Sequence, residues 1–148
     1  MANLPIGNIT SANATMILTV NSLFPAGFQV QQFSVDNAAD MEEVEVAVTR
    51  QSLEGGIVAG YVPSIKVVRF SIEASSPSYE PLCQLYRASE AKRGFYEVGL
   101  SITMPELGKS YVYSRGLLVR ATILPPMRRV LEPTSWTFHF GKFAIAGV

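Results

Sequence analysis

The most constraining feature of this 148-residue chain is an alternation of apolar and polar side chains with a period of two. In residues 134–143, Trp136, Phe138 and Phe140 fall on one side and Thr137 and His139 on the other. Successive side chains of a strand point to opposite faces, so this pattern predicts half-buried β-strands. Similar alternating or β-prone runs occupy residues 15–20, 28–35, 43–49, 65–74, 94–104 and 109–124, the last of them broken near Gly116.

One segment has helical spacing instead. Leu82, Leu85, Tyr86 and Ser89 recur on one helical face, after a Ser-Pro stretch that suits a first turn and before Gly94. The pattern predicts a helix over about 77–91. One helix among about seven strands predicts a mainly β fold, a sandwich or barrel with one packed α-helix, as a single domain over residues 1–148.

Charge is scarce and segregated along the chain. Apolar residues make up 48% and charged residues 16%, and the net charge is zero, which argues against disorder and against a basic nucleic-acid-binding patch. Residues 1–35 carry no charge, residues 36–54 carry six acids and one base, and residues 87–148 carry nine bases and four acids. Two interpretations fit: a solvated face, or an acidic end and a basic end suited to head-to-tail association.

Residues that carry chemistry are few. His139 is the one histidine and Cys83 the one cysteine, too few for the usual zinc site or for an intrachain disulfide. Gly55 and Gly56 are not followed by the spacing of a phosphate loop. We therefore expect no enzyme activity and no catalytic, cofactor or metal site.

Targeting signals are not apparent in the sequence. Residues 1–7 lack the basic start and apolar core of a signal peptide, and no apolar run approaches the ~18 residues of a membrane span. We expect folding in a reducing cytoplasm and no membrane insertion.

Residues 51–64 form an unusual connection between two predicted strands. The segment holds three glycines, which favour a loop, yet it is also rich in apolar side chains: Leu53, Ile57, Val58, Tyr61 and Val62. Long loops inside compact domains are uncommon and are usually functional or disordered, and a disordered loop would be less apolar. Either residues 57–62 add an ordinary strand to the sheet, or the segment is an extended arm that buries its apolar residues on a neighbouring subunit.

Four stretches, in order, resemble the tail-tube proteins of contractile-tailed bacteriophages, particularly those of Pseudomonas-type myophages. They are the strand VEVAVTRQS, the apolar loop LEGGIVAGYVPS, the strand-corner-helix RFSIEASSPSYEPLCQLYRASE, and the bend and last strand ILPPMRRVLEPTSWTFHFGKF. Together with the preceding strand, the resemblance covers residues 28–143. It is carried by the order of the features and not by any single motif.

The resemblance implies a structural protein of the virion tail, assembled in the host cytoplasm. Homohexameric rings would stack into a tube that sheath protein grips, with tape-measure, baseplate and tail-terminator proteins as further partners. DNA would pass through the lumen without specific binding. The loop 51–64 would contact the next ring through Leu53, Ile57, Val58, Tyr61 and Val62, and residues 1–14 would form an N-terminal arm. Glu43 and Glu45 are the candidate lumen-facing acids.

Two alternatives remain open. The tube protein of a contractile injection or type VI secretion machine would share the same fold. A ligand-binding β-barrel would instead use Trp136, Phe138, Phe140 and Tyr96 to line a pocket. Aromatic residues on one strand face usually fill a core, so we expect the core arrangement.

Overall fold

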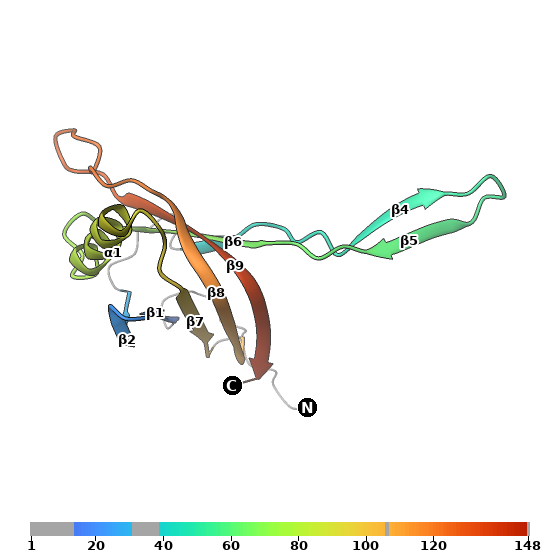
Figure 1. The fold of residues 1–148 in the computed structure, drawn as a ribbon, viewed down its shortest axis with the longest axis horizontal. Coiled ribbons are helices and arrows are strands. Elements are labelled where there is room, and N and C mark those ends of the chain that lie inside the picture. Colours follow the sequence, from blue (N-terminus) through green and yellow to red (C-terminus); the bar gives the residue numbers. More distant parts are fainter. Residues whose placement is uncertain (1–13, 31–38, 106, 148) are drawn as a thin grey trace, which may run out of the picture.

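A computed structural model of the chain describes residues 14–30, 39–105 and 107–147. These residues form nine strands and one helix (Figure 1). The elements are β1 (Thr15–Val20), β2 (Phe24–Gln29), β3 (Ala39–Met41), β4 (Ala47–Gln51), β5 (Ile57–Tyr61), β6 (Lys66–Ile72), α1 (Tyr79–Lys92), β7 (Val98–Met104), β8 (Lys109–Ala121) and β9 (Thr134–Gly147). The predicted mainly β fold with one packed helix is confirmed. The predicted N-terminal arm and most of the predicted run 28–35 fall outside the described residues.

Seven strands form one antiparallel sheet in the order β2-β1-β7-β8-β9-β6-β3, and the sheet is curved but not closed into a barrel (Figure 1). The two remaining strands, β4 and β5, pair only with each other. They form a hairpin that projects from the body of the molecule. The hairpin therefore lies outside the seven-stranded sheet and packs on neither of its faces.

The core lies on the side of the sheet that α1 covers. Trp136, Phe138 and Phe140 are all 0% exposed, and Tyr79 of α1 packs edge-on against Trp136. The helix contributes Leu82 and Leu85, which are also buried, as their spacing predicts. The three aromatic residues of β9 thus fill the core, as expected, and do not line a pocket. Tyr96, the fourth residue of the ligand-binding alternative, is half-buried before β7, with the Lys92 ammonium over its ring.

Several strand boundaries differ from the sequence prediction: β2 begins at Phe24 and not at residue 28, and β9 continues to Gly147. Two further differences concern β4 and β7. Residues 43–46 are not in a strand, because β4 begins at Ala47, where continuous pairing with β5 starts. Residues 94–97 precede β7 because they close the helix: Arg93 adopts a left-handed conformation with φ 55°, and the Gly94 N–H donates to the Ser89 carbonyl. Alternation reports which side chains share a face, and it does not report whether a partner strand is present.

The predicted break near Gly116 is a bulge inside one continuous strand. Arg115 has φ 54°, and the β7–β8 register shifts between Leu100↔Tyr113 and Val98↔Gly116. A bulge bends a strand and increases its twist. The long strands β8 and β9 can therefore curve around the core without ending.

Candidate functional site

The most prominent feature of the molecule is the arm, which we define as residues 42–65. It consists of the β4–β5 hairpin and the two chain segments that join it to β3 and β6, and it projects far beyond the body (Figure 1). Its tip is a tight turn in which the Ser52 N–H donates to the Gly56 carbonyl at 2.8 Å and Gly55 takes φ 87°. Residues 57–61 form β5 of this hairpin and not a strand of the seven-stranded sheet, so the alternative of an extra strand in the main sheet is wrong. Burial of the arm on a neighbouring subunit stays a prediction.

The register of the hairpin gathers four valines on one face of the arm. Directly paired residues share a face, and the pairs Val48↔Gly60 and Arg50↔Val58, with the Val62 N–H donating to the Val46 carbonyl at 3.0 Å, define this face. We call it the valine face; it carries Val46, Val48, Val58 and Val62, with Arg50 paired to Val58 near the tip. Val46 is 63% exposed and Val48 is 54% exposed. A strand face this apolar is ordinarily covered by other protein.

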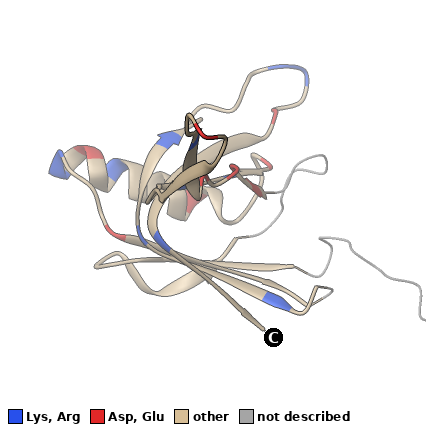
Figure 2. Cartoon of the chain, turned by 90° about the vertical axis from the view of Figure 1, so that its right-hand side faces the viewer, with Lys and Arg blue, Asp and Glu red and all other residues tan. Residues whose placement is uncertain are grey.

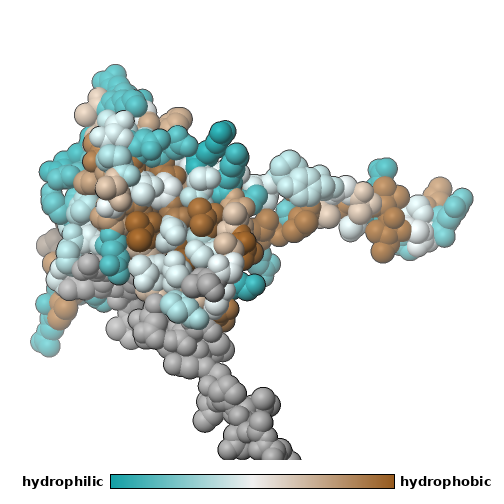
Figure 3. Space-filling view, turned by 90° about the horizontal axis from the view of Figure 1, so that it is seen from below, coloured by the Kyte–Doolittle hydropathy of each residue, from teal (hydrophilic) through white to brown (hydrophobic). Residues whose placement is uncertain are grey.

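The opposite face and the tip of the arm are apolar as well. Ile57 and Tyr61 lie on the face of Ala47 and Thr49, and both are more than three-quarters exposed. Leu53 at the tip is fully exposed. Brown apolar and teal polar residues therefore alternate along the arm in the space-filling view (Figure 3). All five residues proposed from the sequence for contacts between subunits, Leu53, Ile57, Val58, Tyr61 and Val62, lie on this arm.

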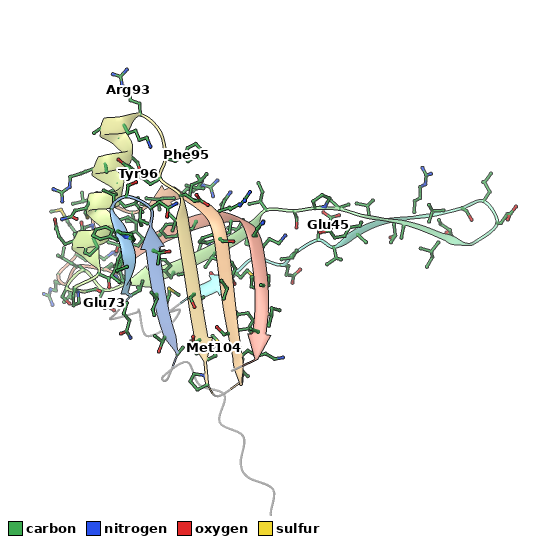
Figure 4. The ribbon with its side chains drawn as sticks, turned by 60° about the horizontal axis from the view of Figure 1, so that its bottom comes forward. Glu45, Glu73, Arg93, Phe95, Tyr96 and Met104 are labelled. Carbon is green, nitrogen blue, oxygen red and sulfur yellow. The ribbon has the colours of Figure 1, made fainter. Side chains whose placement is uncertain are left out.

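Acidic side chains surround the base and tip of the arm. Arg69 of β6 lies 3.3 Å from Glu42 and 3.8 Å from Asp40, which ties the base of the arm to the sheet. Glu43 and Glu45 follow on the exposed segment before β4, and Figure 4 shows Glu45 out on the arm. Their placement beside the lumen stays a prediction.

A second surface lies on the side of the sheet that faces away from the core. Met16 and Leu18 of β1 and Ile102 of β7 point into the core, so the residues that alternate with them along each strand point outward. Across four paired strands this outward set consists almost wholly of small residues, and we call it the hydroxyl face. Its members are Thr15, Ile17, Thr19, Gly99, Ser101, Thr103, Ser110, Val112, Ser114, Lys142, Ala144 and Ala146. It contains one cation and no acid. The sequence reasoning missed this face, whose only signal is the small side chains that alternate with core residues.

The residues with reactive side chains, Cys83 and His139, lie on different elements. Cys83 is on α1, next to Tyr79, whose phenol pKa is raised by burial and then by its hydrogen bond with Cys83. His139 is on β9, paired with Val67 and Leu117. Within the described ranges, no group of three or more His, Cys, Asp and Glu side chains is placed to hold a metal ion. In the same ranges, no helix is long and apolar enough to cross a membrane.

An apolar cavity of about 250 Å³ opens at the end of the core nearest β3. Its walls include Met16, Met41, Met104, Tyr111, Tyr113 and Phe143. The Tyr113 hydroxyl donates to the Met41 sulfur at 3.2 Å across it. Burial, followed by the neighbouring Tyr111, raises the pKa of Tyr113 to about 12.

Solved structures of contractile injection machines contain chains with this fold. A chain of the anti-feeding prophage baseplate, determined with sixfold symmetry, aligns with a TM-score of 0.58 and 15% identity over 100% of this chain and 99% of that chain. A chain of the anti-feeding prophage cap gives 0.57 and 11% over 100% and 95%. A chain of the PVC sheath-tube complex gives 0.55 and 11% over 90% and 88%. At identities this low, these alignments establish the shared fold alone.

The class is therefore that of a structural component of a phage-type tail. The chain belongs to the family described as Tail fiber protein gp32, whose sequence profile matches residues 7–144. No curated protein matches the sequence. The expected relationship to phage-tail proteins is confirmed at this level, and the tube itself stays a prediction.

Proposed function

We propose that this protein forms the inner tube of a contractile tail, as homohexameric rings that stack around a channel. The observation that carries the proposal is the arm: a folded body projects a hairpin whose apolar faces are left uncovered by the rest of the described chain. Full burial of a valine side chain contributes about 1.5 kcal/mol or more. Val46, Val48 and Val58, which are 45–63% exposed, together provide a driving force for association with another protein surface.

The open sheet supports association within a ring. Among the described strands, β2 and β3 each have one neighbour in the seven-stranded sheet and so present an outer edge. Unpaired strand edges bind other strands readily. Edge-to-edge joining of six copies would continue the sheet around a ring, as the sixfold symmetry of the related baseplate structure suggests for this fold.

The hydroxyl face suits the wall of a channel. DNA binds to proteins largely through cations that neutralise its phosphates, and this face has one lysine among small side chains. A wall of this kind lets DNA slide. Glu43 and Glu45, the lumen-facing candidates from the sequence, lie in the segment before β4 and not among the residues of this face. Sheath, tape-measure, baseplate and terminator proteins are the partners that a tube requires, in a virion assembled in the host cytoplasm. The tube of a non-phage contractile injection machine would be built in the same way, and neighbouring genes would distinguish the two.

Electron microscopy and sedimentation of the purified protein test the proposal. We expect hollow tubes, with sixfold rings in end-on views, at high protein concentration. Solid thin fibres would instead support the fibre role that the family description names. A strict monomer at high concentration would contradict both roles.

A further inference from the structure

The end of the molecule opposite the arm carries a second exposed apolar surface. It comprises the loop 122–133 between β8 and β9 and an adjoining groove of about 570 Å³ between α1 and β8. Leu124, Met127 and Val130 of the loop are 70%, 75% and 80% exposed. We call this the far-end surface; its members are Arg93, Phe95, Val119, Arg120, Leu124, Met127, Arg128, Arg129, Val130 and Leu131.

The loop is held in shape by its own contacts. Arg128 pairs with Glu132 at 2.7 Å, and the Glu132 N–H donates to the Pro126 carbonyl at 3.2 Å. The Tyr79 hydroxyl donates to the Ile123 carbonyl and so ties the loop to α1. Its exposed apolar side chains are thus presented by an ordered loop, which lowers the entropic cost of binding a partner.

The net charges of the two ends are complementary. The far end has Arg93, Arg120, Arg128 and Arg129 against Glu90 and Glu132, and the arm has Glu42, Glu43, Glu45 and Glu54 against Arg50. On the far-end surface, Arg93, Arg120 and Arg129 have no carboxylate of the described residues within ion-pair distance. On the arm, Glu43, Glu45 and Glu54 likewise have no cation within that distance in the part of the chain that is described. Figure 2, which looks along the arm, shows acidic segments on the arm and basic segments on the loop at the top. Figure 4 shows Arg93 and Phe95 on the body, well apart from Glu45 on the arm.

One molecule cannot bring these two surfaces together, because they project from opposite ends of its longest axis (Figure 1). A shift of a second copy along that axis places its far-end surface beside the arm of the first. Such a contact joins two different surfaces, and it repeats without closing when the shift is along an axis.

We propose that the arm of one subunit docks on the far-end surface of the next copy along the tube. The apolar arm residues cover the exposed loop and the groove, and the arm carboxylates face the unpaired arginines. The inference rests on the proposed tube function, because it names the partner surface of the same arm.

Cross-linking measures this contact directly. In a Cys83→Ser background, one preparation carries Leu53→Cys and a second carries Val130→Cys, and the two are mixed with a short bismaleimide. We expect a heterodimer that forms at least about tenfold faster than in a control mixture of Leu53→Cys with Val112→Cys, because only the loop lies at the docking site. Equal rates in the two mixtures would overturn the proposal.

Charge reversal provides a second readout. Glu43→Lys/Glu45→Lys and Arg120→Glu/Arg129→Glu should each raise the subunit concentration at which tubes appear by about tenfold, because like charges then meet. Their combination should return it to near the wild-type value. Arg87→Glu, an exposed change on α1 outside the far-end surface, should have little effect.

Tubes from a far-end variant at the wild-type concentration, or a combined variant no better than its parents, would show that the arm docks elsewhere. Absence of tubes from the wild-type protein would contradict the proposed function instead. In that case the cross-linking rates alone decide whether arm and loop meet.

Discussion

Gly116 lies where β8 passes closest to the aromatic core. A Cβ atom added there would be 2.2 Å from Cδ1 of Phe140 and 2.8 Å from the carbonyl oxygen of His139. Both neighbours are held in the sheet, since Phe140 is 0% exposed and its strand is paired on both sides. The position therefore has no room for a side chain.

We predict that Gly116→Ala destabilises the free subunit by about 3 kcal/mol, because relief of the overlap requires displacement of packed groups. Urea unfolding measures the change. Gly60→Ala on the arm is the matched control, since nothing lies within 4 Å of its added Cβ, and its free energy of unfolding should stay near that of the wild type. A Gly116→Ala subunit as stable as the control would mean that β8 and β9 separate easily here.

The raised pKa of Tyr113 predicts that the stability of the subunit depends on pH. Its pKa in the folded protein is raised to about 12 from an ordinary value of 10.0, mainly by burial. The folded state therefore favours the neutral phenol, and this contribution is fully present below pH 10 and is lost as the pH rises through 12. We expect the free energy of unfolding to fall more steeply between these values in the wild type than in Tyr113→Phe. Equal slopes in urea titrations at several pH values would contradict the assignment.

At the scale of elements, substitutions in the valine face should impair assembly without affecting the folding of the subunit. We predict that Val46→Thr/Val48→Thr/Val58→Thr leaves the thermal midpoint of the free subunit nearly unchanged, because these side chains are 45–63% exposed. Tube formation should be lost, because hydroxyl groups would be buried at the contact. Calorimetry and sedimentation measure the two effects.

Val112→Thr is the control for that experiment. It makes the same chemical change at a position 43% exposed on the hydroxyl face, and tubes should form normally. Tubes of wild-type yield from the triple variant would show that the valine face is not an interface.

The strands that could be predicted from the sequence are those whose apolar side chains are buried in the core of the same chain. The run 15–20 is β1, and Val68, Phe70 and Ile72 of β6 are buried on one face as expected. Residues 43–49 show the same alternation, but its apolar side remains uncovered in a single subunit, so the boundary of β4 could not be inferred. The hydroxyl face could not be predicted either, because Ser, Thr and Ala show little contrast between exposed and buried positions.

At the scale of the whole molecule, the proposed channel predicts selective chemical access. In a Cys83→Ser background, Val112→Cys should react with a small maleimide in both free subunits and tubes. A bulky polyethylene-glycol maleimide should label the free subunit readily but label tubes at least about tenfold more slowly, because a channel excludes large reagents from its interior. Gel shifts over time measure the rates.

Gln84→Cys on the exposed side of α1 is the matched position for this comparison. It should accept both reagents in tubes, because the helix lies on the other side of the sheet from the hydroxyl face. If Val112→Cys reacts with the bulky reagent as fast in tubes as in subunits, the hydroxyl face lies outside the tube.

The independent pairing of β4 with β5 makes the arm interchangeable. Its hydrogen-bond ladder does not depend on the seven-stranded sheet, and its side chains do not contribute to the core. We therefore expect that this hairpin can be exchanged, lengthened or shortened while the body still folds. If the proposed tube forms through this arm, an engineered chain with a foreign arm is expected to join the assembly of the donor.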